Sequence, residues 1–142
     1  MTDNSEPVAT TDPTLPASVR GTLIEKLGIE FLEVGAQRTV GRMPVAGNTQ
    51  PAGLLHGGAT AALAETLASV AANLHAGPGR IAVGIELNAT HHRGMREGWV
   101  TGTAEAIHLG RSTASYEIVV ADESGRRICS ARLTCMVLDS SS

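Results

Sequence analysis

The feature that most constrains the fold is one long apolar segment, from about His56 to His75. Its larger apolar residues recur at spacings of four, three and four, the period of a helix with one apolar face, at Leu63, Leu67, Val70 and Leu74. The opposite face carries mostly small residues, which also suit close packing. We therefore expect a central buried helix whose leucine face lies on a sheet.

Glu65 is the only charged side chain between Leu54 and Leu74 if His56 is neutral. It lies on the small-residue face, where burial would disfavour its charged form, and such a carboxylate is either specially paired or held ready for reaction. The alternative is an exposed glutamate on an ordinary amphipathic helix. Ser69 follows one turn later, so its hydroxyl either helps to fix a water or the carboxylate, or is only a small helix residue.

The predicted helix begins at His56-Gly57-Gly58. Two glycines are poor helix residues unless something approaches the backbone closely. Free amides at a helix start point at any bound ligand, and the helix dipole favours developing negative charge. This end is therefore a candidate site for an oxyanion.

The two candidate features are separated along the helix. Nine residues from His56 to Glu65 correspond to about 13.5 Å of rise and half a turn. One reacting carbon cannot touch both within a single chain. If both are catalytic, Gly57 of one helix must meet Glu65 of another, and two antiparallel helices about a two-fold axis supply that arrangement twice. We therefore expect a homodimer, on the condition that both features act in catalysis.

The rest of the chain predicts an α+β domain of 17–138, between a disordered tail at 1–16 and a frayed end at 139–142. A short helix is expected over 18–27, with Ser18 as N-cap, with Leu23, Ile24 and Leu27 buried, and closed by Gly28. Alternating apolar residues predict strands at about 29–34, 37–44, 81–87, 99–109, 112–121 and 126–138. The turn formers at 122–125 predict an antiparallel hairpin, so the architecture is an antiparallel sheet with one central helix.

Composition excludes several function classes. A net charge of -3 with one Trp, one Tyr and one Phe does not suit a nucleic-acid surface. No run reaches the roughly 18 apolar residues of a membrane span and no signal pattern begins the chain, so we expect the cytoplasm. Cys129 and Cys135 lie about 20 Å apart along one predicted strand, too far for a disulfide. The five histidines match no common zinc pattern, so neither metal nor cofactor is expected.

Several motifs, in order, resemble the hotdog-fold acyl-CoA thioesterases, most closely the branches acting in 1,4-dihydroxy-2-naphthoyl-CoA hydrolysis and enterobactin-pathway proofreading. They cover roughly 20–138 and are Gln50–Ala59, Ala64–Thr66, Ser69, Val83–Ala89, His91, Arg93, Arg96–Gly98, His108–Gly110 and Gly125–Arg126. The resemblance implies the hotdog fold, a curved antiparallel sheet wrapped around one long helix. It also implies paired subunits, usually a dimer of dimers and hence a homotetramer.

The resemblance also implies roles for individual residues. Glu65 matches the catalytic carboxylate, as general base or nucleophile, Gln50 and Ser69 match residues that position substrate or water, and His56 with the Gly57 amide matches the pair that polarises the carbonyl. Coenzyme A contacts fall on Gly84, His91, His92, Arg93, Gly94, His108, Leu109, Gly110, Arg111, Ser112 and Thr113. Independently of the family, Arg93, Arg96 and Arg111 are the main local concentration of positive charge, which suits phosphates, unless they are only solvated strand ends.

The function expected from this resemblance is hydrolysis of an acyl-CoA, with an aromatic or hydroxylated aromatic acyl group. Ala52 departs from the family, where an aromatic residue often follows the proline, so the acyl pocket is expected to be wider. Sequence leaves open whether an acyl-carrier protein replaces coenzyme A. Two rivals remain: an acyl-CoA hydratase or dehydratase of the same fold, which usually pairs its carboxylate with a histidine, and a non-catalytic acyl-CoA-binding module.

Overall fold

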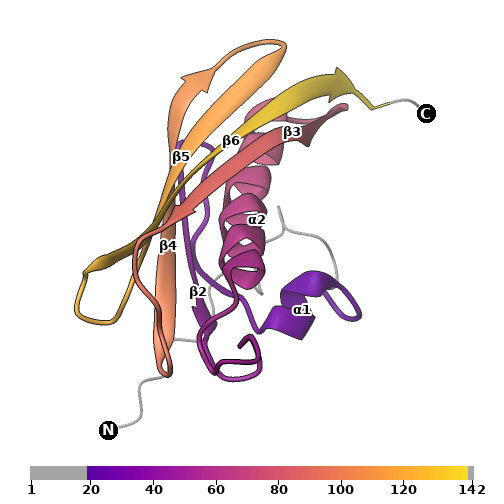
Figure 1. Ribbon diagram of the computed structural model, residues 1–142. Helices are drawn as coiled ribbons and strands as arrows, with labels where there is room; N and C mark the ends of the chain where they lie inside the picture. Colours follow the sequence, from indigo (N-terminus) through magenta and orange to yellow (C-terminus); the bar gives the residue numbers. More distant parts are fainter. Residues whose placement is uncertain (1–18, 141–142) are drawn as a thin grey trace, which may run out of the picture.

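The computed structural model describes residues 19–140, which form two helices and six strands (Figure 1). In chain order they are α1 (Leu23–Leu27), β1 (Glu30–Glu33), β2 (Arg38–Pro44), α2 (Gly57–Ala76), β3 (Arg80–His91), β4 (Trp99–Leu109), β5 (Thr113–Ala121) and β6 (Arg127–Asp139). The predicted tail at 1–16, the predicted domain start at Ala17 and the predicted N-cap Ser18 lie outside the described residues.

The strands form one sheet in the order β1-β2-β4-β5-β6-β3, and every neighbouring pair is antiparallel. The predicted hairpin at 122–125 is confirmed: Asp122 Oδ1 accepts hydrogen bonds from the backbone amides of Ser124 and Arg126, both at 2.9 Å. Because of this order, β3 lies at an edge of the sheet, and within residues 19–140 its only partner strand is β6.

Helix α2 lies in the concave side of this curved sheet (Figure 1). Leu63 and Leu67 are fully buried. Leu67 lies over Gly41 and Gly102, which are partners across β2 and β4, and a Cβ on either glycine would lie 2.6 or 2.7 Å from a Leu67 methyl. Their missing side chains let the helix approach the strands closely. The predicted α+β hotdog fold, with a sheet curved around one long helix, is confirmed.

Several predicted details were wrong. Helix α1 begins at Leu23 after Thr22 rather than at 18, although Gly28 does end it in the left-handed conformation. Leu23, expected to be buried, is 55% exposed, because so short a helix turns only one side toward the core. Val70 and Leu74 of the predicted stripe are only partly buried.

Strand β3 is longer than the predicted 81–87, since it pairs with β6 as far as His91. The large apolar residues stop at Leu87, whereas the backbone ladder continues beyond it. The predicted strand 99–109 matches β4, and the remaining predicted strands differ from the observed ones by at most one residue at each end. Cys129 and Cys135 are buried free thiols, as predicted.

Candidate active site

Glu65 lies in the middle of α2, and its carboxylate rests on strand β3. A Cβ placed on Gly84 would lie 2.8 Å from Glu65 Oε2. The side chain is partly buried, and it makes no hydrogen bond or ion pair with any residue in 19–140. The expectation of a carboxylate without a basic partner is therefore met within one chain.

The negative charge of Glu65 affects the pKa of a neighbouring thiol. Cys135 of β6 pairs with Gly84 across the sheet, beneath the carboxylate. Burial, and then the Glu65 charge, raise the pKa of Cys135 to about 11. Burial also raises the pKa of Cys129. Both thiols are thus protonated packing residues rather than nucleophiles at neutral pH.

The start of α2 is built from close contacts between glycines and histidine rings. The Gly58 amide donates to His56 Nδ1 at 2.8 Å, which makes His56 the N-cap. Because Nδ1 accepts this bond, a neutral His56 ring carries its proton on Nε2, which is then free to donate. A Cβ on Gly58 would lie 2.9 Å from the His56 ring, and one on Gly57 would lie 3.0 Å from His91 Nε2. Close approach to the backbone was the predicted reason for both glycines.

The Gly57 amide remains available to a ligand, because it donates no hydrogen bond within residues 19–140. It faces a cavity of about 330 Å³ whose lining combines polar loop and strand ends with apolar residues: Gln50, Leu54, Leu55, Gly57, Thr60, His91, His92, Arg93, Gly94 and Ile128. The structure thus brings Gln50, Gly57 and the 91–94 segment, all predicted site residues, to one cavity. Sequence reasoning missed Thr60 and Ile128, since no local pattern indicates that they line a cavity.

Gln50 is held by its own loop. Its Oε1 accepts a hydrogen bond from the Ala52 amide, and the loop is closed by bonds from Gly53 N to Gln50 O and from Gln50 N to Leu54 O, at 2.9 and 2.8 Å. The side-chain NH₂ makes no bond to another described residue, so it is free to donate. A donor fixed at a cavity wall suits a positioning role.

A second cavity, of about 350 Å³, lies on another side of the helix start. Its lining is mainly small or apolar: Leu23, Leu27, Gly47, Asn48, Thr49, His56, Gly58, Ala59 and Ala62. The first turn of α2 therefore contributes to both cavities, of which the first also contains Arg93 and two histidines.

Ser69 is partly buried one turn after Glu65. Its carbonyl accepts a bond from Asn73 Nδ2 at 2.9 Å, whereas its hydroxyl makes no bond to Glu65 within the described chain. The role predicted for Ser69, positioning the substrate or a water, stays a prediction.

The second predicted coenzyme A segment, 108–113, is a tight turn between β4 and β5. The Gly110 amide donates to Thr113 O at 2.8 Å, and Ser112 O accepts from Val137 N at 2.8 Å. The Nε2 atom of His75, in the last turn of α2, lies 2.6 Å from Gly110 O. The turn is therefore anchored to the carboxyl end of the helix.

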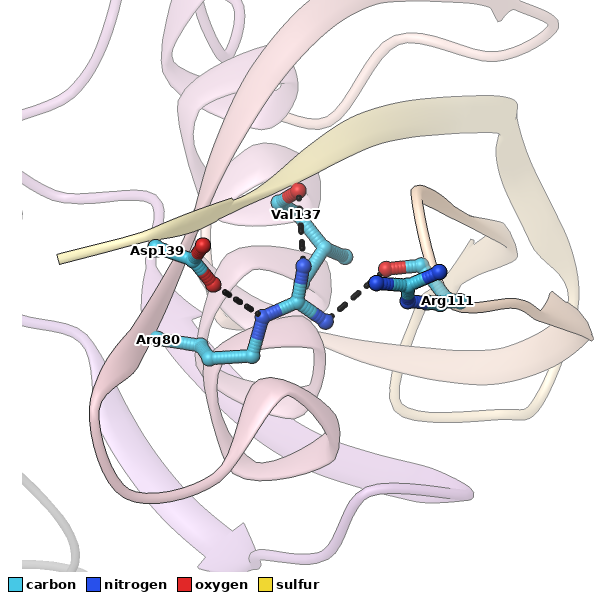
Figure 2. Close-up of polar contacts among 4 residues, drawn as sticks. All are labelled: Arg80, Arg111, Val137 and Asp139. Atoms are coloured by element: carbon cyan, nitrogen blue, oxygen red, sulfur yellow. Dashed lines mark hydrogen bonds and ion pairs between the residues drawn. The ribbon is translucent and has the colours of Figure 1, made fainter.

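Arg80 holds the same turn from the other side. Its guanidinium donates to Asp139 Oδ1 at 3.0 Å, to Arg111 O at 2.9 Å and to Val137 O at 3.4 Å (Figure 2). These bonds fix the backbone at Arg111, while the exposed Arg111 side chain has no hydrogen-bonded or ion-paired partner in the described chain.

The predicted cluster of Arg93, Arg96 and Arg111 is wrong for a single chain. Arg111 lies beside Arg80 at the first residue of β3, whereas Arg93 and Arg96 follow its last residue. A strand from 80 to 91 is about 36 Å long. Spacing along the sequence does not reveal that the two segments flank opposite ends of one strand. Arg96 is also engaged, donating to Ala52 O at 3.3 Å.

Glu65 and Gly57 are separated in the same way. Glu65 rests on β3 at Gly84, and Gly57 approaches β3 at His91, seven residues farther along the strand. Within one chain the carboxylate and the free amide therefore do not face a common point, in agreement with the spacing argument.

No three His, Cys, Asp or Glu side chains within 19–140 gather where they could hold a metal ion. No helix in that range is long and apolar enough to cross a membrane.

Comparisons with known proteins agree on one family. The model of the thioesterase superfamily matches residues 52–129. Proofreading thioesterase EntH of Cronobacter turicensis is 49% identical over 87% of this chain and 91% of the relative. A thioesterase structure from Haemophilus influenzae superimposes with a TM-score of 0.81 at 38% identity, covering 85% of each chain. A mutant thioesterase from Pseudomonas aeruginosa gives a TM-score of 0.83 at 41% identity, covering 87% of this chain and 91% of that one.

Proposed function

Because the chain belongs to the thioesterase superfamily, we propose that it hydrolyses an acyl-coenzyme A to a free acid and coenzyme A, with Glu65 as its catalytic carboxylate. The observation that carries the proposal is the Glu65 side chain itself, an acidic group without a described partner in the middle of an apolar helix.

The carbonyl oxygen of the thioester is bound at the start of α2. The free Gly57 amide and His56 Nε2 are the donors, and the helix dipole adds to their effect as negative charge develops on the oxygen. Glu65 either activates water or attacks the carbonyl carbon itself. In the first route water adds to the carbonyl carbon as Glu65 takes its proton. In the second route the Glu65 oxygen adds to that carbon to form a mixed anhydride, which water then hydrolyses to the free acid and the regenerated carboxylate. In both routes the carbon–sulfur bond breaks, and coenzyme A leaves as a thiol after gaining a proton.

The active site is shared between two chains. Glu65 of one subunit acts on a carbonyl held at the Gly57 end of its partner, because the two groups are too far apart in one chain. The two coenzyme A segments support the same arrangement. Segments 91–94 and 108–113 flank opposite ends of β3, so two antiparallel subunits are needed to bring one of each to a single substrate.

Strand β3 provides the surface for this pairing. It is an edge strand with three exposed large apolar residues, Ile81, Val83 and Ile85, at 42%, 39% and 53% exposure. The unpaired backbone N–H and C=O groups of such an edge can hydrogen-bond to a strand of another chain. Asn73 bonds the amide and carbonyl of Ala82, at 3.0 and 3.2 Å, and so covers only the beginning of the edge.

The outer face of the sheet suits a second level of assembly. Ile81 pairs with Leu138 and Val83 with Met136, and all four side chains are 39–42% exposed. Their alternation with the buried Ala82 and Val137 places them on the outer face. Two dimers that cover this patch against each other would form a homotetramer. A solution mass of only two chains would show that the assembly stops at the dimer.

The two cavities beside the helix start suit the two arms of a thioester. The polar cavity with His91, His92 and Arg93 takes the coenzyme A arm, and the apolar cavity with Leu23, Leu27 and Ala62 takes the acyl group. An aromatic or hydroxylated aromatic acyl group is the substrate we favour, because the second cavity combines an apolar wall with the polar groups of Asn48 and Thr49. An acyl-carrier-protein thioester would present the same pantetheine arm.

The test is release of free thiol from aromatic and aliphatic acyl-CoA substrates, comparing the purified protein with Glu65→Gln. We expect kcat to fall roughly 10²- to 10⁴-fold while KM changes little, since the carboxylate acts in the transition state. Glu105→Gln is the matched control and should retain wild-type turnover, because Glu105 is an exposed carboxylate on β4, away from β3, with no hydrogen bond or ion pair within residues 19–140.

Three results would contradict the proposal. Glu65→Gln with most of its turnover would remove Glu65 from the mechanism. A hydrated product without thiol release would identify a hydratase. Tight acyl-CoA binding without any turnover across the panel would indicate a binding module.

A further inference from the structure

Gly84 of β3 lies against the Glu65 carboxylate. A Cβ there would lie 2.8 Å from Glu65 Oε2 and 3.3 Å from Leu133 Cδ1. The first distance is shorter than any ordinary contact to a Cβ, so every residue other than glycine would need the space that the carboxylate occupies. The carboxylate is the end of a flexible side chain, whereas Leu133 is fully buried in the core. A methyl group at 84 would therefore displace the carboxylate before it displaced the sheet.

Backbone conformation does not explain this glycine. Eight other glycines have a positive φ, which L side chains rarely adopt, but Gly84 is not one of them. Glycine in the interior of a strand loses packing and often marks a close approach by another group. The group that approaches Gly84 is Glu65, so the missing side chain provides space rather than flexibility.

Strand β3 also changes register at this point. Gly84 pairs with Cys135 and Glu86 with Thr134, so Ile85 is an additional residue in a β-bulge. Bulges bend a strand and redirect its residues beside functional sites. Gly84 and the bulge together form a shallow seat for the carboxylate between α2 and the exposed edge of the sheet.

We propose that Gly84 is a positioning residue for the Glu65 carboxylate, because the absence of its side chain lets Glu65 lie against the sheet where it faces the partner subunit's thioester. This inference rests on the proposed function. It differs from the coenzyme A contact that family resemblance implies for Gly84, because a contact residue acts through substrate affinity and a positioning residue acts through the rate of the chemical step.

The test is Gly84→Ala, assayed with whichever acyl-CoA the wild-type protein hydrolyses best. We expect kcat to fall roughly 10- to 100-fold, since misplacing a reacting group by about 1 Å has that effect. KM should change less than about threefold. The melting temperature should remain close to wild type, because the displaced atoms belong to a flexible side chain.

A double-mutant cycle separates this role from a purely structural one. If Gly84 acts through Glu65, adding Gly84→Ala to Glu65→Gln should leave the residual rate unchanged within about twofold. If Gly84→Ala folds poorly, Leu133→Val removes the other atom that crowds the new methyl group. The pair Gly84→Ala/Leu133→Val is then compared with Leu133→Val alone.

The outcomes are distinct from those that test the proposed function. A wild-type protein that hydrolyses no thioester would overturn the proposed function. An active wild type with normal kcat in Gly84→Ala would overturn this inference alone. A raised KM at unchanged kcat would make Gly84 a substrate contact, and an equal loss of rate in the Glu65→Gln background would show that it does not act through Glu65.

Discussion

A single backbone amide makes the start of α2 a candidate oxyanion site. Gly57 is the first helical residue, and its N–H has no acceptor within 19–140. Proline is favoured at this position of a helix and has no N–H. His56 already has the extended conformation that precedes a proline, with φ -68° and ψ 127°.

Gly57→Pro therefore removes the proposed oxyanion donor at little cost to the helix. We expect kcat to fall roughly 10²- to 10³-fold, the usual effect of losing one such donor. Gly57→Ala is the matched control, because it adds the same Cβ beside His91 and keeps the N–H. Equal turnover of the proline and alanine variants in a thiol-release assay would show that the Gly57 amide does not stabilise the transition state.

At the scale of single residues, the sequence predicted unusual residues within one element better than it predicted contacts between elements. The isolation of Glu65 in an apolar helix was visible as a pattern and is present in the structure. The seat on Gly84 was not predictable, because it joins α2 to a strand by tertiary packing. The sequence predicted a reason for the paired glycines, but not that His56 and His91 are the groups that approach them.

Among the elements, the β5–β6 hairpin depends on a charged turn residue. Asp122 Oδ1 accepts bonds from the Ser124 hydroxyl and from the amides of Ser124 and Arg126. These bonds, led by the Ser124 hydroxyl, lower the pKa of Asp122 to about 2. Because the folded pKa lies below the unfolded value of about 3.9, the charged form contributes stability above pH 4 that is lost as the pH falls toward 2.

Asp122→Ala should therefore lower the melting temperature by roughly 2–4 °C near neutral pH. The difference from wild type should be constant between about pH 5 and 7 and should shrink between about pH 4 and 2. Asp122→Asn, which keeps an acceptor oxygen without the charge, should show a smaller difference near neutral pH that shrinks over the same range, because the titrating group is the wild-type carboxylate. A gap for Asp122→Ala as large at pH 2.5 as at pH 6 would disprove the role of the charge.

The elements that local chemistry specifies were the predictable ones. Helical periodicity identified α2 to within a residue, and turn residues identified the hairpin. The extent of β3 was missed because its large apolar residues stop at Leu87, while backbone pairing with β6 continues to His91. Helix α1 was predicted too long because nothing in its sequence shows how much of it the core covers.

At the scale of the whole molecule, the groups proposed to act together lie far apart within one chain. Glu65 and the Gly57 amide meet β3 at different points, and the two coenzyme A segments flank its opposite ends. The linear sequence predicted the first separation through helix geometry. It could not predict the second, because only the sheet order shows that Arg93 and Arg111 lie at opposite ends of β3. The proposed two-fold pairing of subunits would resolve both separations.

Complementation between two inactive chains tests this shared site most directly. Glu65→Gln retains an intact helix start, and Gly57→Pro retains an intact carboxylate. A mixed dimer therefore has one complete site and one that lacks both groups. With random pairing of equal amounts, half of the dimers are mixed, so co-expression should restore about a quarter of wild-type kcat per chain. Activity that stays at the residual level of the two separate variants would contradict a site built from two subunits.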